Sequence, residues 1–450
     1  MLVRISVENF KSFDSREELS MISSSKIREK KEHKVKIKQT SLLRNSVIYG
    51  ANASGKSNII RAFALIKATL NGGIPMDAMN HYCRNKKENE NRESVFELQF
   101  TIDNKFYAYG FSCILSKRII TEEWLFELLQ NGVAKELFTR DNNAKVHLGD
   151  TVKPSINEEN RFKVYADDFA GHDYELFISE MNRGKKYEDN SKLIFFKDVF
   201  DWMNRNIIIL TPEIGISNSE IFYNKKSLDE LSNLIRTFDT GITEVLTKNI
   251  TMDELNKIIP VELFKDVVNH LQKQIQNSDT NKVQASWRFN DSFISVRKIG
   301  NEEPEIRTLV LKHGNSDFDY GEESDGTKRL FDLVDILISH GDDVIFVIDE
   351  LERSLHPKLT ERFLELFMES HANEKVQLLF TTHEDTIMSQ SLFRRDEIWF
   401  VERDNNNASK IYSLDRFKQR YDKVLSKAYL EGRYGAIPVF KKFTFSQEEK

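Results

Sequence analysis

Cysteine, proline and long apolar runs are scarce in this sequence of 450 residues. Only Cys83 and Cys113 are present, which is too few for a disulfide framework or a cysteine-rich zinc site and fits a reducing cytosol. No apolar run reaches the roughly 18 residues of a membrane span, and the N-terminus alternates apolar and polar residues instead of forming a signal core. We therefore expect a cytoplasmic protein that does not span a membrane.

Positive charge does not dominate either, because 65 Lys and Arg face 71 Asp and Glu and give a net charge of −6. Contact with nucleic acid would therefore need a local basic patch. The stretch from Lys26 to Lys38 is one candidate for binding a phosphate backbone, although such runs are more often solvated loops. The length and the 40% share of hydrophobic residues predict a folded chain with a sizeable core.

Apolar periodicity predicts an α/β chain. Strands are expected at residues 3–7 and 46–49, and a sub-sheet of antiparallel strands at 94–139. An amphipathic helix follows the second strand, with its apolar face made of Ile59, Phe63, Ile66 and Leu70. The last third of the chain alternates strand and helix, with a helix from about 326, a strand at 344–348, a helix at 357–369, and strands at 376–381 and 397–402. This alternation predicts a parallel, doubly wound sheet.

Residues 50–57 form a complete G-x-x-x-x-G-K-[ST] motif between a predicted strand and a predicted helix. In such a loop the glycines and the helix N-terminus direct N–H groups at phosphates, Lys56 supplies a positive charge, and the Ser57 hydroxyl coordinates magnesium. A chance glycine-rich turn would not have both flanking elements. We therefore predict ATP and Mg²⁺ as ligands. The predicted nucleotide-binding residues of this loop are Gly50, Asn52, Ser54, Gly55, Lys56, Ser57 and Asn58.

The apolar strand at 344–348 ends in two carboxylates, Asp349 and Glu350. On its own, this pattern is common and reflects solvation of a strand end. Downstream of a phosphate-binding loop it predicts that Asp349 holds magnesium and that Glu350 orients and deprotonates the attacking water.

Residues 323–329, Glu-Ser-Asp-Gly-Thr-Lys-Arg, precede a predicted helix and resemble the signature loop of ABC-type ATPase heads. An ordinary capped helix start is the simpler interpretation of this string by itself. In ABC-type heads the serine and glycine of this loop complete the nucleotide site of a second subunit. The resemblance therefore implies a homodimer in which Ser324, Gly326 and Thr327 face the partner's nucleotide.

His383 ends the predicted strand at 376–381, after Thr381 and Thr382. A lone histidine is usually structural, but in ABC-type heads a histidine at this place bonds the terminal phosphate and the attacking water. We predict Lys56, Glu350 and His383 as the catalytic residues. The other histidines lack ligand spacing, so we predict no zinc site.

Together these motifs resemble the ABC-type ATPases of the overcoming-lysogenization-defect and RecF/SMC-like group, and most closely the RloA-type bacterial ATP-binding proteins of the AAA family. Further matching strings lie at 9–13, 238–242, 398–402 and 429–438. The resemblance implies a P-loop NTPase of the ABC-ATPase (SMC/RecF-like head) type, α/β, with a mixed sheet, an antiparallel sub-sheet and a mainly helical insertion. The implied parts are an N-terminal part of the head at 1–150, the insertion at 151–285, and a C-terminal part of the head at 286–450.

The resemblance also implies an ATPase of anti-phage defence. No acidic, TOPRIM-like nuclease domain follows His383, so nuclease or toxin activity is expected in a separate effector protein encoded nearby, with a phage-derived trigger. A RecF/SMC-like DNA-repair ATPase that clamps DNA is the alternative. A transporter subunit is disfavoured by the long insertion and by the lack of a recognisable glutamine loop.

Overall fold

The computed structural model describes residues 1–169, 171–211, 221–261, 264–265, 268–269, 272, 282–289, 292–338, 341–417 and 424–438. The chain divides into two compact units, and each unit is assembled from separate stretches of sequence. Unit 1 comprises Met1–Ile209, Asp342–Asp349 and Lys375–Lys450, and unit 2 comprises Leu210–Gly341 and Glu350–Glu374.

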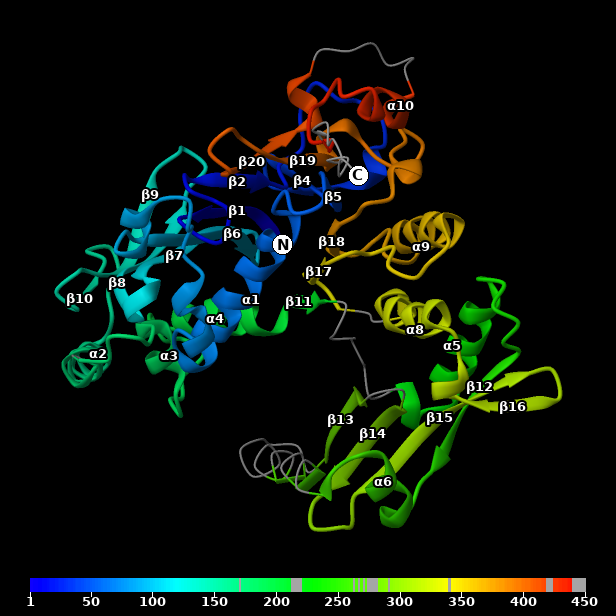
Figure 1. Ribbon diagram of the computed structural model, residues 1–450. Coiled ribbons are helices and arrows are strands. Elements are labelled where there is room, and N and C mark those ends of the chain that lie inside the picture. The colour runs from blue at the N-terminus through cyan, green and yellow to red at the C-terminus, as the bar shows by residue number, and fades with distance from the viewer. Residues whose placement is uncertain are drawn as a thin grey trace, which may run out of the picture. The chain divides into compact units, whose positions relative to one another are not determined.

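A seven-stranded antiparallel sheet forms one part of unit 1, with strand order β10-β9-β8-β7-β6-β1-β2 (Figure 1). Its strands are β1 (Leu2–Glu8), β2 (Glu17–Ser20), β6 (Ser94–Ile102), β7 (Lys105–Ile114), β8 (Ile119–Leu128), β9 (Ala134–Arg140) and β10 (Val146–Leu148). This sheet contains the antiparallel strands that the sequence predicts at 94–139. Residues 3–7 lie in β1, which pairs with β6 through Ile5 and Leu98.

The second sheet of unit 1 carries the phosphate-binding loop, with strand order β11-β17-β18-β5-β19-β20. Its strands are β5 (Asn45–Tyr49), β11 (Ile207–Leu210), β17 (Ile345–Ile348), β18 (Gln377–Thr381), β19 (Ile398–Arg403) and β20 (Ser409–Ser413). Strands β17, β18, β5 and β19 are parallel, and β20 is antiparallel to β19. The sheet is therefore mixed. A two-stranded sheet, β3 (Lys34–Ile37) with β4 (Thr40–Leu43), completes the strands of unit 1.

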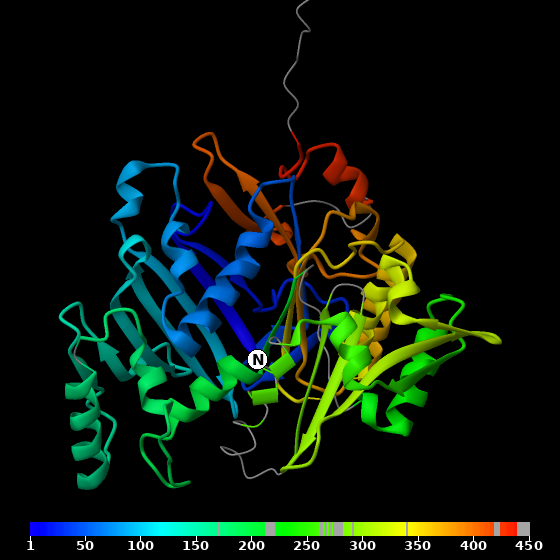
Figure 2. The same cartoon turned by 60° about the horizontal axis from the view of Figure 1, so that its bottom comes forward.

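Helices of unit 1 bury apolar residues in one large core, namely α1 (Lys56–Gly72), α2 (Ile156–Asp168), α3 (Phe177–Asn182) and α4 (Phe195–Arg205). Helix α10 (Leu425–Leu430) also belongs to unit 1. Figure 2 shows α1 in blue beside the blue and cyan strands of the seven-stranded sheet. The predicted apolar face of this helix is confirmed, because Ile59, Phe63, Ile66 and Leu70 are all at most 2% exposed. The helix ends at Gly73, whose φ of +74° suits glycine.

Unit 2 contains a separate antiparallel sheet, order β12-β15-β14-β13, with β16 paired to β15. Its strands are β12 (Glu244–Asn249), β13 (Lys282–Phe289), β14 (Ser292–Ile299), β15 (Glu305–His313) and β16 (Ser316–Asp319). Its helices are α5 (Lys225–Arg236), α6 (Met252–Ile258), α8 (Asp325–Ile338) and α9 (Pro357–Ser370). The α8 and α9 helices confirm the two helices expected near 326 and 357.

Short 3-10 helices connect the elements, namely η1 (Lys31–His33), η2 (Met76–Asn80), η3 (Lys87–Glu90), η4 (Leu115–Lys117), η5 (Ile221–Tyr223), η6 (Tyr320–Glu322), η7 (Asp385–Ile387), η8 (Arg395–Glu397) and η9 (Leu414–Arg416). Two contacts join the basic stretch at 26–38 to the residues that precede β19. His33 lies at the end of η1 and contacts the Glu397 carboxylate through Nδ1 at 2.9 Å. Lys30 bonds the carbonyl oxygen of Ser391 through Nζ.

The predicted insertion at 151–285 contains both element types. Helices α2 to α6 lie within it, and so do β11, β12 and the first part of β13. These strands pair with β14, β15 and β17, which all follow residue 285. Among the helices that the structure describes, none is long and apolar enough to cross a membrane.

Candidate nucleotide-binding site

The phosphate-binding loop connects the buried strand β5 to helix α1 in unit 1. All five residues of β5 are buried, so the strand holds the loop at the centre of the mixed sheet. Helix α1 begins at Lys56, has no side-chain cap at Gly55, and has no acidic residue in its first turn. Its N-terminal N–H groups and its dipole therefore suit an anion.

Two glycines let the loop pass close to neighbouring backbone. A Cβ on Gly50 would lie far inside contact distance of the Val401 carbonyl oxygen of β19. A Cβ on Gly55 would lie 2.5 Å from Ser12 Oγ and closer still to Ser409 Oγ, and its φ is +113°. The motif glycines are therefore required by space as well as by conformation.

Lys56 is buried and its ammonium group lies on the loop. Nζ donates to the carbonyl oxygens of Gly50 at 2.7 Å and Ala51 at 3.3 Å. Nζ also lies 3.3 Å from Nδ1 of His383. Because an ammonium group can only donate, Nδ1 is the acceptor and the proton of a neutral imidazole is on Nε2. The structure thus brings together two of the three predicted catalytic residues, 327 positions apart in the sequence.

Asp349 follows β17 and is 9% exposed. Its Oδ1 accepts a 2.6 Å hydrogen bond from Thr381 Oγ1, at the end of the adjacent parallel strand β18. Strand β18 in turn pairs with β5. Since parallel strands have their carboxyl ends at one edge of the sheet, Asp349, Thr381 and the phosphate-binding loop share that edge.

The other predicted loop residues differ in environment. Asn52 is exposed, Ser54 is buried, and Ser57 is half-buried. The Asn58 carboxamide donates to Ser12 Oγ at 2.8 Å and accepts from Arg61. Asn58 therefore links α1 to the segment after β1, and its contact with nucleotide stays a prediction.

Two serines that the motifs did not single out support the loop. The Ser409 hydroxyl, at the start of β20, donates to the Ser54 carbonyl oxygen at 2.5 Å, and its Oγ lies 2.6 Å from Ser12 Oγ. Its backbone N–H donates to the Ser12 carbonyl oxygen. Ser12 belongs to the Asn-Phe-Lys-Ser-Phe string at 9–13, which was the only sequence signal for this part of the site.

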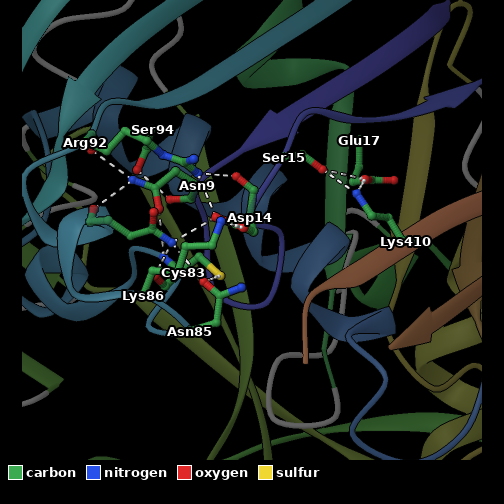
Figure 3. Close-up of polar contacts among 11 residues, drawn as sticks. Asn9, Asp14, Ser15, Glu17, Cys83, Asn85, Lys86, Arg92, Ser94 and Lys410 are labelled. Atoms are coloured by element: carbon green, nitrogen blue, oxygen red, sulfur yellow. Dashed lines mark hydrogen bonds and ion pairs between the residues drawn. The ribbon is translucent and has the colours of Figure 1, made fainter. Parts of the chain in front are cut away.

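Polar contacts hold the 9–14 segment in place, as Figure 3 shows. The Asn9 carboxamide donates to the carbonyl oxygens of Asn89 and Arg92, and Ser94 donates to the Asn9 carbonyl oxygen. Asp14 forms ion pairs with Lys86 at 2.8 Å and with Arg92 at 3.1 Å. The segment beside the loop is thus anchored at both ends.

The pKa of Asp14 reflects these contacts. Burial raises this pKa, but hydrogen bonds from Lys86, Asn89 and Asn85, with the charge of Lys86, outweigh burial and lower the pKa to about 2.

Figure 3 also shows Lys410 of β20, which contacts Ser15 and Glu17 and so connects β20 to β2.

The predicted signature residues lie in unit 2 at the start of α8. Ser324 Oγ accepts from the backbone N–H of Thr327 at 3.1 Å and lies 2.9 Å from Thr327 Oγ1. Ser324 is therefore the N-cap of α8. A Cβ on Gly326 would lie 2.7 Å from the Ser354 carbonyl oxygen, so the backbone at Ser354 packs directly against the start of α8.

Glu350 also belongs to unit 2 and directly follows Asp349 in the chain. Its φ is +49°, a left-handed conformation that costs a residue with a Cβ about 1–2 kcal/mol. Its carbonyl oxygen accepts from the Arg329 guanidinium of α8 at 3.2 Å and from the Arg353 N–H at 3.1 Å. These contacts support the strained turn after β17.

The residues of unit 1 fit a nucleotide phosphate with a bound magnesium ion. An uncapped helix N-terminus, a buried ammonium group and a glycine cradle suit phosphate oxygens. Ser57 and Asp349 would hold Mg²⁺, because a hydroxyl and a carboxylate are hard oxygen ligands. Within the described residues, no group of three or more His, Cys, Asp or Glu could hold a metal by itself.

Residues 46–389 match the family described as AAA domain, putative AbiEii toxin, Type IV TA system. The chain belongs to this AAA family. The match includes every predicted site residue, and it makes the chain an AAA-type P-loop ATPase. The predicted α/β P-loop NTPase fold, with a mixed sheet and an antiparallel sub-sheet, is confirmed.

Solved structures similar to this AAA chain include an SMC head bound to the C-winged helix domain of ScpA, at 15% identity and a TM-score of 0.40 over 92% of this chain and 97% of that chain. The SMC head domain from Thermotoga maritima has 15% identity and a TM-score of 0.33 over 92% of this chain and 98% of that chain. No curated protein sequence matches the chain.

Proposed function

We propose that the chain hydrolyses ATP with Mg²⁺. The observation that carries this proposal is the 3.3 Å contact between Lys56 Nζ and His383 Nδ1, at the sheet edge that also bears Asp349. A lysine with a purely structural role would not require a surrounding glycine-rich loop. A histidine with a purely structural role would not require contact with that lysine. Together they suit a site that neutralises phosphate charge and orients a terminal phosphate.

Each residue of the proposed site has a role that follows from its chemistry. Lys56 and the N–H groups of α1 neutralise the charge on the phosphate oxygens. Ser57 and Asp349 hold Mg²⁺, which would lower the charge on the outer phosphates when bound. Glu350 accepts the proton of the attacking water, and His383 hydrogen-bonds the terminal phosphate.

The proposed active form is a head-to-tail homodimer with two composite sites. Ser324, Gly326 and Thr327 of one copy would face the nucleotide held by the other. The start of α8 supports this in part, because Ser324 caps the helix through its hydroxyl, although Asp325 places a negative charge in the first turn. Gly326 adds support, because its hydrogen side chain allows close backbone approach.

We further propose that this ATPase is the sensor of a cytoplasmic anti-phage defence system of RloA-like type. The family description names a toxin–antitoxin system, which supports a partner protein that carries the toxic activity. The tail string at 429–438 adds the sequence resemblance. In this proposal ATP binding reports a phage-derived trigger to a separate effector.

The enzymatic proposal is tested by phosphate release from the purified chain with ATP and Mg²⁺. Turnover should require Mg²⁺ and should be lost in Lys56→Ala, because that change removes the positive charge on the loop. Lys163→Ala, an exposed lysine of α2, is the matched control and should keep full turnover. Turnover by Lys56→Ala at the native rate would refute the site.

The cellular proposal is tested by affinity purification of the tagged chain from cells that carry the native neighbouring genes, with and without phage infection. Recovery of one neighbouring protein, with a change on infection, is expected. A DNA-stimulated ATPase without such a partner would favour the repair alternative.

A further inference from the structure

A cavity lies in unit 1, between α2, the end of α3 and residues 183–193, and its lining includes no residue of the phosphate-binding loop. Its volume is about 930 Å³, at the upper end of the roughly 300–1,000 Å³ of small-ligand sites. Its buried wall is apolar and includes Phe162, Met181 and Leu193.

Positive charge gathers around this cavity in a chain of net charge −6. Five cationic side chains line it, namely Lys153, Arg161, Lys185, Lys186 and Lys192, against the carboxylates of Glu158 and Glu188. Lys185 is neutralised by Glu180 at 2.5 Å. Over the residues that the structure describes, the other four cations have no carboxylate partner, so their charge is available to a ligand.

One of the two lining carboxylates is already satisfied. Glu158 accepts hydrogen bonds from the Ser191 hydroxyl at 2.6 Å, the Lys192 N–H at 3.1 Å and the Ser155 N–H at 2.7 Å. The Ser191 hydroxyl, followed by the Ser155 and Lys192 contacts, lowers the pKa of Glu158 to about 2. These bonds also tie residues 191–192 to the start of α2, which fixes the mouth of the cavity before any ligand binds.

Two tyrosine rings face the same space. Arg161 donates to the Tyr165 hydroxyl at 3.3 Å, and Lys185 Nζ lies 4.2 Å from the centre of the Tyr165 ring. The Tyr187 hydroxyl donates to the Met181 carbonyl oxygen at 2.8 Å. Both rings are half-buried and held by these contacts. Lys185 covers one face of the Tyr165 ring, so a base would stack on the opposite face of that ring or on Tyr187, at low entropic cost.

We propose that this cavity binds a nucleotide through its phosphate and its base, supplied by single-stranded nucleic acid or as a free nucleotide. Unpaired lysines and an arginine suit phosphate oxygens, and aromatic rings suit stacked bases. A duplex backbone would use the cations alone and would leave the rings and the apolar wall without a role. This site is separate from the one that binds ATP, and it does not depend on ATP hydrolysis.

The first arm of the test uses the full chain without added nucleotide, so that no free nucleotide competes for the cavity, and a fluorescein-labelled single strand of about 12 nucleotides. Anisotropy titrations compare the native chain with Lys186→Glu/Lys192→Glu, and with Lys163→Glu as the control. Lys163 is on α2, is 65% exposed, and does not line the cavity. The double variant should bind at least about tenfold more weakly, with a salt dependence of log K that is smaller by about 1.4. The control should match the native chain.

Stacking is tested at Tyr165 with two variants of similar size. Tyr165→Leu removes the ring and should weaken binding by about five- to 150-fold, the range for loss of one stacked base. Tyr165→Phe keeps the ring and should bind within about twofold of the native chain. Thermal melting of each variant checks that the fold is retained, and the Tyr165→Phe result separates stacking from a general loss of structure.

The second arm titrates AMP into the Lys56→Ala chain by calorimetry, so that the phosphate-binding loop does not dominate the signal. Binding of the strand with the expected variant pattern identifies single-stranded nucleic acid as the source. Binding of AMP alone, weakened by Lys186→Glu/Lys192→Glu, identifies a free nucleotide. If neither probe binds, or if both double variant and Tyr165→Leu bind as the native chain does, the proposal is wrong. Because ATP turnover is measured separately, this result would leave the proposed ATPase unaffected.

Discussion

Substitution of Gly55 by alanine tests whether the phosphate-binding loop depends on the support of Ser12 and Ser409. The new Cβ would lie 2.5 Å from Ser12 Oγ and closer to Ser409 Oγ, where real Cβ atoms do not occur. Neither hydroxyl moves freely, because Ser409 bonds Ser12 and the Ser54 carbonyl oxygen. The residue would also have to keep a φ of +113°.

The expected loss of stability in Gly55→Ala has two parts. A left-handed conformation costs an alanine about 1–2 kcal/mol, and overpacking of a filled site costs about 1–3 kcal/mol. Gly55→Ala should therefore destabilise the region by about 2–5 kcal/mol. In a Ser12→Ala/Ser409→Ala background both oxygens are gone, and the Cβ of residue 409 would lie 3.1 Å from the new Cβ. There the same substitution should cost only the conformational part.

Gly132→Ala is the matched control, because Gly132 has a φ of +80° with nothing within 4 Å of its Cβ position. It should show the conformational cost alone and leave ATP turnover unchanged. Urea unfolding followed by hydrogen exchange in peptides of α1 and of the β8–β9 turn measures both costs locally. Turnover of Gly55→Ala should fall by up to about 100-fold, since small displacements of catalytic groups are costly. An equal cost of Gly55→Ala in both backgrounds would refute the proposed packing.

Three further outcomes follow from the site. Glu350→Gln should bind ATP but fail to hydrolyse it in single-turnover assays, because an amide cannot accept the water's proton, and normal hydrolysis would exclude Glu350 as the base. By itself, the Ser324→Trp variant should have no ATP turnover. When it is mixed with Lys56→Ala, part of the turnover should return, because a mixed dimer retains one site with both halves intact. Inactivity in proven mixed dimers would count against composite sites. Asp14, whose folded pKa of about 2 lies below its ordinary 3.8, should contribute stability above about pH 4 that is lost as the pH falls towards 2. Asp14→Asn should lack that part of the acid-induced fall in melting temperature, and an unchanged pH profile would contradict the role of its ion pairs.

Local features of this protein follow from the sequence alone. The phosphate-binding loop needs glycines, a lysine and a serine at fixed spacing, so one short string predicts it together with its flanking strand and helix. The buried face of α1 was predictable for the same reason, because a 3.6-residue period places Ile59, Phe63 and Ile66 on one side without any knowledge of the rest of the chain.

Contacts between distant segments were decided by the tertiary structure. Thr381 reaches Asp349 because β18 pairs with β17, and Lys56 meets His383 because β18 also pairs with β5. Ser409 reaches Ser12 across almost 400 residues, and Ser409 belongs to none of the motifs or matching strings. Sequence periodicity reports which residues are buried, but not which strand lies next to which.

In the middle of the chain, sequence periodicity also fails to determine the secondary structure. Residues 210–285 contain short apolar runs that suit a helix turn or a short strand equally well, and the sequence predicts mainly helix there. In the structure, β12 and β13 are strands because β15 and β14 supply their hydrogen-bond partners. A short segment adopts the strand conformation only when a distant segment satisfies its backbone groups, and that partner is chosen by the fold as a whole.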